Sequence, residues 1–339
     1  MSLEELLSPY ISAINAEMRT MVENAGESHR DLFGMLRYHL GWVDASFEQC
    51  DGRSGKRVRP VLCLLSSEGC GGNWQQALPA AAAVELLHNF SLIHDDVEDQ
   101  DETRRGRSTV WSLWGEAQAI NAGDTLFAVS QLALLCLGEK GMSASKVVEA
   151  ARLFNETCIA LTGGQHLDIE FESRDDVMVE DYLTMIEGKT AALVSSSCEL
   201  GALIAGAPVA QREHLRAFGR HAGLAFQMLD DILGIWGDSR TTGKPVGADI
   251  VRRKKTLPLL HCLERSEELR ALMLQDTLSE TDVRRAKSML EGTGSREYAE
   301  QLARRHHEAA LNALERANLY DAAAEMLREL AHRLLNRRR

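Results

Sequence analysis

The sequence predicts an all-α fold, organised as a single large helical bundle over residues 1–339. Apolar residues recur at helical spacing almost throughout, and no stretch shows the sustained period-two alternation that is typical of strands. Proline accounts for only 6 residues, which permits long helices. Aromatic residues make up 5%, which is low for a sheet-rich fold. The 45% hydrophobic fraction is typical of a globular chain and excludes disorder.

Two apolar stripes show how the helices are predicted. In residues 77–92 one stripe passes through Ala80, Val84 and Leu87, and residues 124–137 carry a similar stripe. Glycine-rich segments predict the joins between helices, at residues 69–73, 138–141, 206–208 and 238–247. The segments between these joins run for roughly 15 to 30 residues, a length that suits a helical bundle.

Composition and charge exclude several classes of partner. The chain has 38 basic and 50 acidic residues, and a net charge of −12 argues against a nucleic-acid-binding surface. No apolar run reaches the 18 or so residues that a membrane span needs, so we expect no span. The seven cysteines are scattered and form no C-x-x-C pair, which is typical of a reduced, cytoplasmic protein without structural zinc.

Two acidic clusters follow strongly apolar runs. The first contains Asp95, Asp96 and Asp99, and the second is the pair Asp230 and Asp231. In a helix, Asp95 and Asp99 lie on one face, about 6 Å apart. Like charges at that spacing are unfavourable unless a cation lies between them, and oxygen ligands with room for water suit Mg²⁺. The alternative interpretation, a solvated helix face, becomes weaker because the same pattern occurs twice.

Basic residues accompany both clusters. Lys56 and Arg59 have the spacing of one helical face, and Arg104 and Arg105 follow the first acidic cluster. Around the second cluster lie three further lysines, Lys189, Lys244 and Lys254. Arginine binds phosphate through a planar fork and lysine supplies a compact charge. The pattern therefore indicates a site for two polyphosphates, one bound through metal and one bound directly.

Taken in order, these motifs resemble those of the trans-isoprenyl diphosphate synthase (polyprenyl synthetase) family, and in particular its short-chain geranylgeranyl and farnesyl diphosphate synthases. The motifs lie within residues 55–258 and read GKRVRP (55–60), LIHDDVED (92–99), RRG (104–106), GGQHLD (163–168), GKTAAL (188–193), FQMLDD (226–231) and GK…KKTLP (243–258). Each motif alone is weak evidence, whereas the ordered set is specific. The resemblance implies the isoprenoid synthase fold, with the active site at the centre of the bundle, and a homodimer.

The resemblance also implies a role for each matching residue. About three Mg²⁺ ions would be bound at Asp95, Asp99 and Asp230, supported by Asp96 and Asp231. The allylic diphosphate would be contacted by Arg104, Lys189, Lys244 and Lys254. Isopentenyl diphosphate would be bound by Lys56, Arg59, His88 and Arg105. Thr190 and Gln227 would stabilise the carbocation that forms when the allylic diphosphate ionises and isopentenyl diphosphate attacks.

The length of the prenyl product is expected to depend on side chains that precede Asp95 on the same helix. Ser91 and Phe90 lie about one turn earlier, and Phe90 would form a floor while Ser91 leaves room beside it. One ring at this depth resembles synthases that stop near geranylgeranyl diphosphate. The residues of the next turn, Leu86 and Leu87, are the alternative floor. A farnesyl or longer-chain product therefore remains open.

One position departs from the family pattern. The second cluster is usually D-D-x-x-D, and here its fifth position is Gly234. Asp238 would either replace the missing carboxylate or cap the following loop. Two other classes stay open at this point. A class I terpene cyclase would have no need of Lys56, Arg59 and Arg105, and a non-catalytic subunit of a two-chain synthase tends to lose its acidic clusters, which are present in this sequence.

Overall fold

The structure is a computed structural model in which the described residues are 2–26, 29–50, 52, 55–237, 247–275 and 277–335. The chain groups into two compact units. The first unit comprises Met1–Asn155, Ser197–Pro208 and Tyr320–Ala324, and the second comprises Glu156–Ser196, Val209–Leu319 and Glu325–Arg339. The single domain expected over residues 1–339 stays a prediction.

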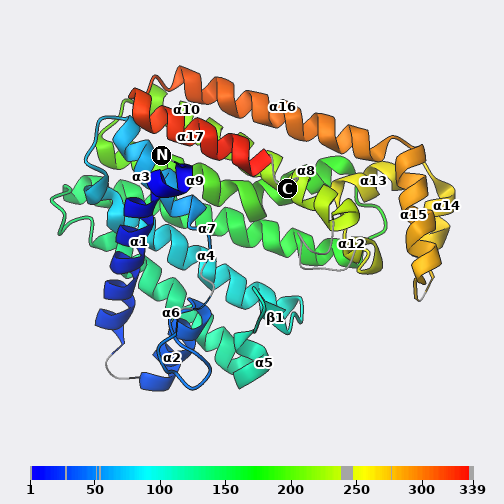
Figure 1. Cartoon of the computed structure of the whole chain (residues 1–339), viewed down its shortest axis with the longest axis horizontal. Coiled ribbons are helices and arrows are strands. Elements are labelled where there is room, and N and C mark those ends of the chain that lie inside the picture. Colours follow the sequence, from blue (N-terminus) through cyan, green and yellow to red (C-terminus); the bar gives the residue numbers. More distant parts are fainter. Residues whose placement is uncertain are drawn as a thin grey trace. The chain divides into compact units, whose positions relative to one another are not determined.

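The first unit is built from helices and one short hairpin. Its elements are α1 (Leu3–Ala25), α2 (Arg30–His39), α3 (Val58–Gly69), η1 (Trp74–Ala77), α4 (Leu78–Glu98), β1 (Thr103–Arg104), β2 (Arg107–Ser108), α5 (Val110–Trp114), α6 (Glu116–Leu135), and parts of α7 (Ala144–Glu172) and α9 (Ala192–Ala205). Helix α4 packs along α6 and also contacts α1 and α3 (Figure 1).

Helix α4 is the element that carries the first acidic cluster. Pro79 lies in its first turn, where proline loses no helical hydrogen bond, and the four alanines that follow it are fully buried. Near the other end, α6 approaches closely at Gly123, where a Cβ atom would lie 2.2 Å from His94 Nε2. Small residues therefore hold α4 tightly among its neighbours. The helices predicted over 77–92 and 124–137 are confirmed in α4 and α6.

The hairpin is a feature of this unit that the periodicity did not predict. Strands β1 and β2 have two residues each, too few to show an alternating pattern. Arg105 and Gly106 connect them with φ values of 55° and 77°. Two consecutive positive φ angles are typical of a tight hairpin turn. The turn presents Arg104 and Arg105 on a short, fixed loop directly after α4.

The second unit is also helical. Its elements are the remainder of α7 and α9, α8 (Val179–Ile186), η2 (Glu187–Ala191), α10 (Val209–Trp236), α12 (Ala248–Val251), α13 (Leu257–Leu263), α14 (Glu267–Met273), α15 (Glu280–Gly292), α16 (Ser295–Arg316) and most of α17 (Asp321–Leu335). The long helix α16 packs along α10 (Figure 1). The predicted all-α fold class is confirmed.

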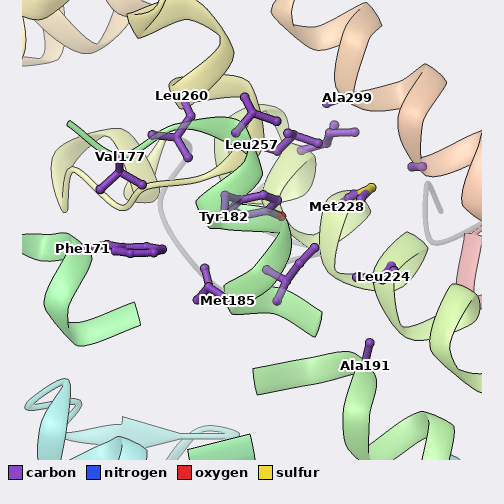
Figure 2. Packing of buried hydrophobic residues seen from close by; sticks show 14 residues of the cluster. Phe171, Val177, Tyr182, Met185, Ala191, Leu224, Met228, Leu257, Leu260 and Ala299 are labelled. Carbon is purple, nitrogen blue, oxygen red and sulfur yellow. The ribbon is translucent and has the colours of Figure 1, made fainter. Parts of the chain in front are cut away.

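A buried cluster joins α8, α10 and α13 in this unit. Tyr182 lies at its centre, with Met185, Met228 and Leu257 around it (Figure 2). The Tyr182 side chain is only 1% exposed, so its hydroxyl needs an internal partner. That partner belongs to the second acidic motif, which ties this core directly to the candidate site.

Segment η2 is a single π-helical turn between α8 and α9. Close backbone contact with α7 fixes it, because a Cβ on Gly164 would lie 2.0 Å from the Lys189 backbone nitrogen. A Cβ on Gly188 would lie 2.6 Å from the Ala160 carbonyl oxygen. Turns of this kind are frequent at functional sites. Here the turn carries Lys189 and Thr190, two of the predicted site residues.

None of the seven cysteines, all of which lie in described segments, forms a disulfide. Across the described helices, none combines the length and apolarity that crossing a lipid bilayer would require.

Candidate active site

The first acidic cluster lies at the C-terminal end of α4. Asp95 is in the last turn and Asp99 is the C-cap, and the Asp99 backbone N–H donates to the Asp95 carbonyl at 2.8 Å. The helical spacing predicted for the two carboxylates is therefore confirmed. The helix dipole is negative at this end, so carboxylates here need positive charge nearby.

The donor set of this cluster fits magnesium. Within the described segments, no three histidine, cysteine or carboxylate side chains converge as a complete metal site. Mg²⁺ does not require such a cage, because it is usually bound by one or two carboxylates together with water and substrate phosphates. Asp95, half-buried, and Asp99, exposed, provide such a partial set of oxygen ligands.

Arg104 bridges the two adjacent aspartates. Its Nη2 donates to Asp95 Oδ2 at 2.9 Å, and its Nε donates to Asp96 Oδ1 at 2.5 Å. Asp96 is 1% exposed, and burial raises its pKa to about 6 although the Arg104 charge opposes this shift. Asp96 is therefore an internal anchor that holds Arg104 beside the acidic end of α4.

A small cavity beside this end of α4 is rich in arginine. We call it the arginine-lined cavity, and its walls include His39, Asp96, Arg104, Arg105 and Arg107. Burial, followed by the charges of Arg105 and Arg104, lowers the pKa of His39 to about 3. His39 is consequently a neutral imidazole at physiological pH. Apart from Asp96, which pairs with Arg104, these walls carry cationic or neutral nitrogen groups, which suits an anionic ligand.

Two of the predicted isopentenyl diphosphate residues lie together nearby. Arg59 Nη1 is 3.3 Å from His88 Nε2, and a Cβ on Gly55 would lie 2.9 Å from Arg105 Nη2. Burial, and next the charge of Arg59, keep the pKa of His88 well below its usual value. The structure therefore brings the segment before α3, α4 and the hairpin to one place.

Unpaired donors in this region fit a bound phosphate. In the part of the chain that the structure describes, Arg57 Nη2 and Arg59 Nε are buried and have no hydrogen-bond partner. Leaving such donors unsatisfied is costly, so both guanidinium groups are candidates to bind an anion.

The expectation that Lys56 and Arg59 share a helical face is wrong. Helix α3 begins at Val58, and Arg57 before it adopts the left-handed conformation with φ 53°. Lys56 therefore lies outside the helix and is exposed. Arg57, which sequence reasoning passed over, is buried, with Nη1 2.6 Å from Glu85 Oε1.

In the second unit, a chain of hydrogen bonds runs through the predicted catalytic residues. Thr190 Oγ1 donates to Gln227 Oε1 at 2.9 Å, and Gln227 Nε2 donates to Asp231 Oδ1 at 3.0 Å. Asp231 Oδ2 accepts from Tyr182 Oη at 2.6 Å and from the Leu257 backbone N–H at 3.1 Å. Burial raises the pKa of Asp231 to about 7 despite these donors. Asp231 thus fixes Gln227 and, through it, Thr190.

The other charged residues predicted around the second acidic cluster lie near this series of hydrogen bonds. Asp230 is exposed and Lys254 is half-buried, and the Lys254 charge acts on Asp231. Lys189 Nζ forms an ion pair with Asp168 Oδ2 at 2.5 Å. Lys244, like Asp238, lies outside the described residues.

The predicted chain-length residues lie on α4. The Phe90 ring centroid is 4.8 Å from that of His94 and 5.3 Å from that of Phe127 on α6. Ser91 Oγ donates to the His88 carbonyl at 2.8 Å, and Leu87 is fully buried. The structure thus adds a second ring, Phe127, which sequence spacing did not reveal.

Sequence reasoning missed several residues that organise the site, namely His39, Arg57, Glu85, Asp168 and Tyr182. Asp168 had a signal, because it ends the GGQHLD motif. Tyr182 and Glu85 had none, since a single polar residue within an apolar helical run looks like many others. Their roles arise from partners that are distant in sequence.

The comparisons with known proteins agree with this geometry. The chain is 42% identical over 311 residues to a (2E,6E)-farnesyl diphosphate synthase of Mycobacterium bovis, covering 89% of this chain and 85% of that protein. It is 43% identical over 305 residues to a geranylgeranyl diphosphate synthase of Mycobacterium tuberculosis, covering 88% and 86%. The crystal structure of a polyprenyl synthetase from Streptomyces coelicolor matches with a TM-score of 0.90 and 37% identity, over 98% of this chain and 100% of that one. The polyprenyl synthetase family model matches residues 41–291, and the chain belongs to that family.

Proposed function

We propose that this chain-elongating prenyltransferase condenses isopentenyl diphosphate with an allylic diphosphate and releases mainly geranylgeranyl diphosphate. Enzymes of this family use Mg²⁺. The observation that supports the proposal most is the acidic end of α4, held by Arg104 beside the arginine-lined cavity. Carboxylates for metal and donors for phosphate are adjacent there.

For the allylic diphosphate we propose metal ligands and several basic residues. Asp95 and Asp99 would bind Mg²⁺ and Asp230 a further ion, about three in all. When bound, the ions supply positive charge that stabilises the departing diphosphate. Arg104, which donates hydrogen bonds to Asp95 and Asp96, would stabilise the negative charge that develops on the departing diphosphate. The basic residues proposed for the same diphosphate are Arg104, Lys189, Lys244 and Lys254.

The carbocation would be stabilised by oriented oxygen atoms. The Thr190 hydroxyl donates a hydrogen bond to Gln227 Oε1, which leaves the lone pairs of the hydroxyl oxygen available to positive charge. Asp231 holds the Gln227 amide in one orientation. Isopentenyl diphosphate would be bound by Lys56, Arg59, His88 and Arg105, and fixed positioning would replace a chance encounter with the cation.

The proposal is tested by incubating the purified protein with Mg²⁺, isopentenyl diphosphate and each allylic diphosphate in turn. We expect pyrophosphate release and a longer prenyl diphosphate, identified by mass spectrometry. Cyclic hydrocarbons formed without isopentenyl diphosphate would support a terpene cyclase instead. Absence of elongation with every starter would contradict the proposal and favour a non-catalytic subunit.

The chain-length role of Phe90 gives the first specific prediction. We expect Phe90→Ala to shift the product distribution toward longer prenyl diphosphates, because it removes the ring that is proposed to close the space below Asp95. Product analysis by mass spectrometry measures the shift. Leu113→Ala, which truncates an exposed side chain, is the control. An unchanged distribution would place the floor elsewhere, for example at Leu87.

Farnesyl diphosphate is the second candidate product. It is favoured by the Phe127 ring, which adds bulk beside Phe90. Phe127→Ala as a single substitution distinguishes the farnesyl from the geranylgeranyl product. If both rings limit the chain to farnesyl length, removing either Phe90 or Phe127 should give a longer product.

We also propose a homodimer that uses the outer face of α6. Three apolar side chains on that helix are strongly exposed, with Ile120 at 45% and both Leu132 and Leu135 at 54%. Exposed apolar side chains that lie on one helix are typical of an interface. Leu132→Asp should therefore produce monomers in sedimentation velocity experiments. Leu274→Asp, which alters a side chain that is 73% exposed, is the control and should leave the assembly unchanged. A wild-type chain that sediments as a monomer would refute the proposal.

A further inference from the structure

Three buried polar atoms that line the arginine-lined cavity have no hydrogen-bond partner among the described residues. They are His39 Nε2, Asp96 Oδ2 and Thr109 Oγ1. Asp96 and Thr109 are only 1% and 3% exposed, so leaving these atoms unsatisfied is costly. Thr109 is the N-cap residue of α5, yet its side chain makes no capping bond to the described helix, which leaves its hydroxyl available to the cavity.

Contacts between the end of α2 and the hairpin fix two of these side chains. Tyr38 Oη donates to the Ser108 carbonyl at 2.8 Å, and Arg107 Nη1 donates to the Tyr38 carbonyl at 3.2 Å. The Arg107 guanidinium also lies over the Tyr38 ring, 4.1 Å from its centroid. Tyr38 and Ser108 directly precede His39 and Thr109 in the chain, so these contacts hold His39 and Thr109 at the same cavity.

A single water molecule matches this cavity in size and in hydrogen bonding. The centre of a water can occupy about 20 Å³ of the cavity, and roughly 10–15 Å³ is enough for one water. The space is too small for a diphosphate, which would contact the arginines from outside it. A buried water typically makes about three hydrogen bonds. It can therefore satisfy the Asp96 carboxylate, the Thr109 hydroxyl and the neutral His39 imidazole, whose Nε2 donates or accepts according to its tautomer.

We propose that His39 is a positioning residue, which holds Asp96 through one buried water molecule and thereby fixes Arg104 at the acidic end of α4. The inference rests on the proposed function, in which Arg104 contacts the allylic diphosphate. Asp96 Oδ1 accepts from Arg104 Nε at 2.5 Å, so a partner that fixes the other carboxylate oxygen, Oδ2, also fixes the orientation of this ion pair. His39 acts on the substrate only through these partners.

The first test compares Michaelis constants. His39→Met, which fills the space without a polar nitrogen, should raise the KM for the allylic diphosphate about tenfold, the order of effect of one lost buried hydrogen bond, and should change the KM for isopentenyl diphosphate by less than about twofold. His39→Gln places an amide near the position of Nε2 and should restore the wild-type KM. His29→Met, at the exposed N-cap residue of α2, is the control. A wild-type KM in His39→Met, or equal impairment of His39→Gln and His39→Met, would overturn the inference.

The second test is a crystal structure of the wild-type chain without substrate. We expect one ordered water about 2.7–3.2 Å from each of His39 Nε2, Asp96 Oδ2 and Thr109 Oγ1. An empty cavity, or an anion in place of the water, would contradict the inference. Should the His39 variants fail to fold, Thr109→Val replaces them in the kinetic comparison and should raise the same KM, because it keeps the shape of threonine and removes the hydroxyl. The crystal structure requires no turnover, so absence of elongation by the wild-type chain would contradict the proposed function alone.

Discussion

Replacing Asp95 with alanine is expected to lower kcat/KM at least about a hundredfold, as removal of a group that stabilises transition-state charge commonly does. Asp95 combines a carboxylate at the acidic end of α4 with a direct contact to Arg104. Its loss would remove a proposed metal ligand and one of the two anchors of that arginine. Steady-state kinetics at saturating Mg²⁺, with pyrophosphate release as the signal, measures the effect.

The fold should survive this change. Asp95 is half-buried at the negative end of a helix, so alanine there relieves an unfavourable interaction with the helix dipole. Thermal unfolding should therefore occur close to the wild-type temperature. Glu98→Ala, at an exposed carboxylate in the same turn, is the matched control and should keep most of the activity. Near-normal turnover of Asp95→Ala would remove the metal role from the first acidic motif.

The parts of the fold that the sequence predicts well are governed by local geometry. The stripe through Ala80, Val84 and Leu87 predicted α4, because helical periodicity depends only on neighbours three and four positions apart. The spacing of Asp95 and Asp99 was predictable for the same reason. The all-α class was predicted from that periodicity, and composition supported it, since few prolines permit long helices and few aromatic residues are unusual in sheet-rich folds.

Features that depend on tertiary contact were not predictable in this way. The left-handed conformation of Arg57 excludes Lys56 from α3, and no local pattern signals it. The π-helical turn at Lys189 exists where Gly164 permits backbone contact with α7.

Arg57→Met is expected to destabilise the first unit by about 3–5 kcal/mol, the usual cost of removing one partner of a buried ion pair. The side chains of Arg57 and Glu85 are 1% and 3% exposed, and Nη1 lies 2.6 Å from Oε1. Arg57 Nε also donates to Asn15 Oδ1 at 3.0 Å, which links α1 to the start of α3. Methionine fills a similar volume but leaves the Glu85 carboxylate buried without its cation. Urea denaturation, followed by circular dichroism, measures the loss as a lower midpoint.

A double variant separates the ion pair from the packing around it. Replacing both partners, as Arg57→Met with Glu85→Leu, should recover much of the lost stability, because no buried charge is then left uncompensated. If the double variant is as unstable as Arg57→Met alone, the loss arises from the contact with Asn15 or from packing. Activity should not recover in parallel, since burial lowers the pKa of Arg59 and of Arg105 and the Glu85 charge opposes that lowering for both guanidinium groups. We then expect the double variant to be stable and still to bind isopentenyl diphosphate poorly. That result would assign the Arg57–Glu85 pair a second role, which is to balance the charge of Arg59 and Arg105, the arginines proposed to bind that substrate.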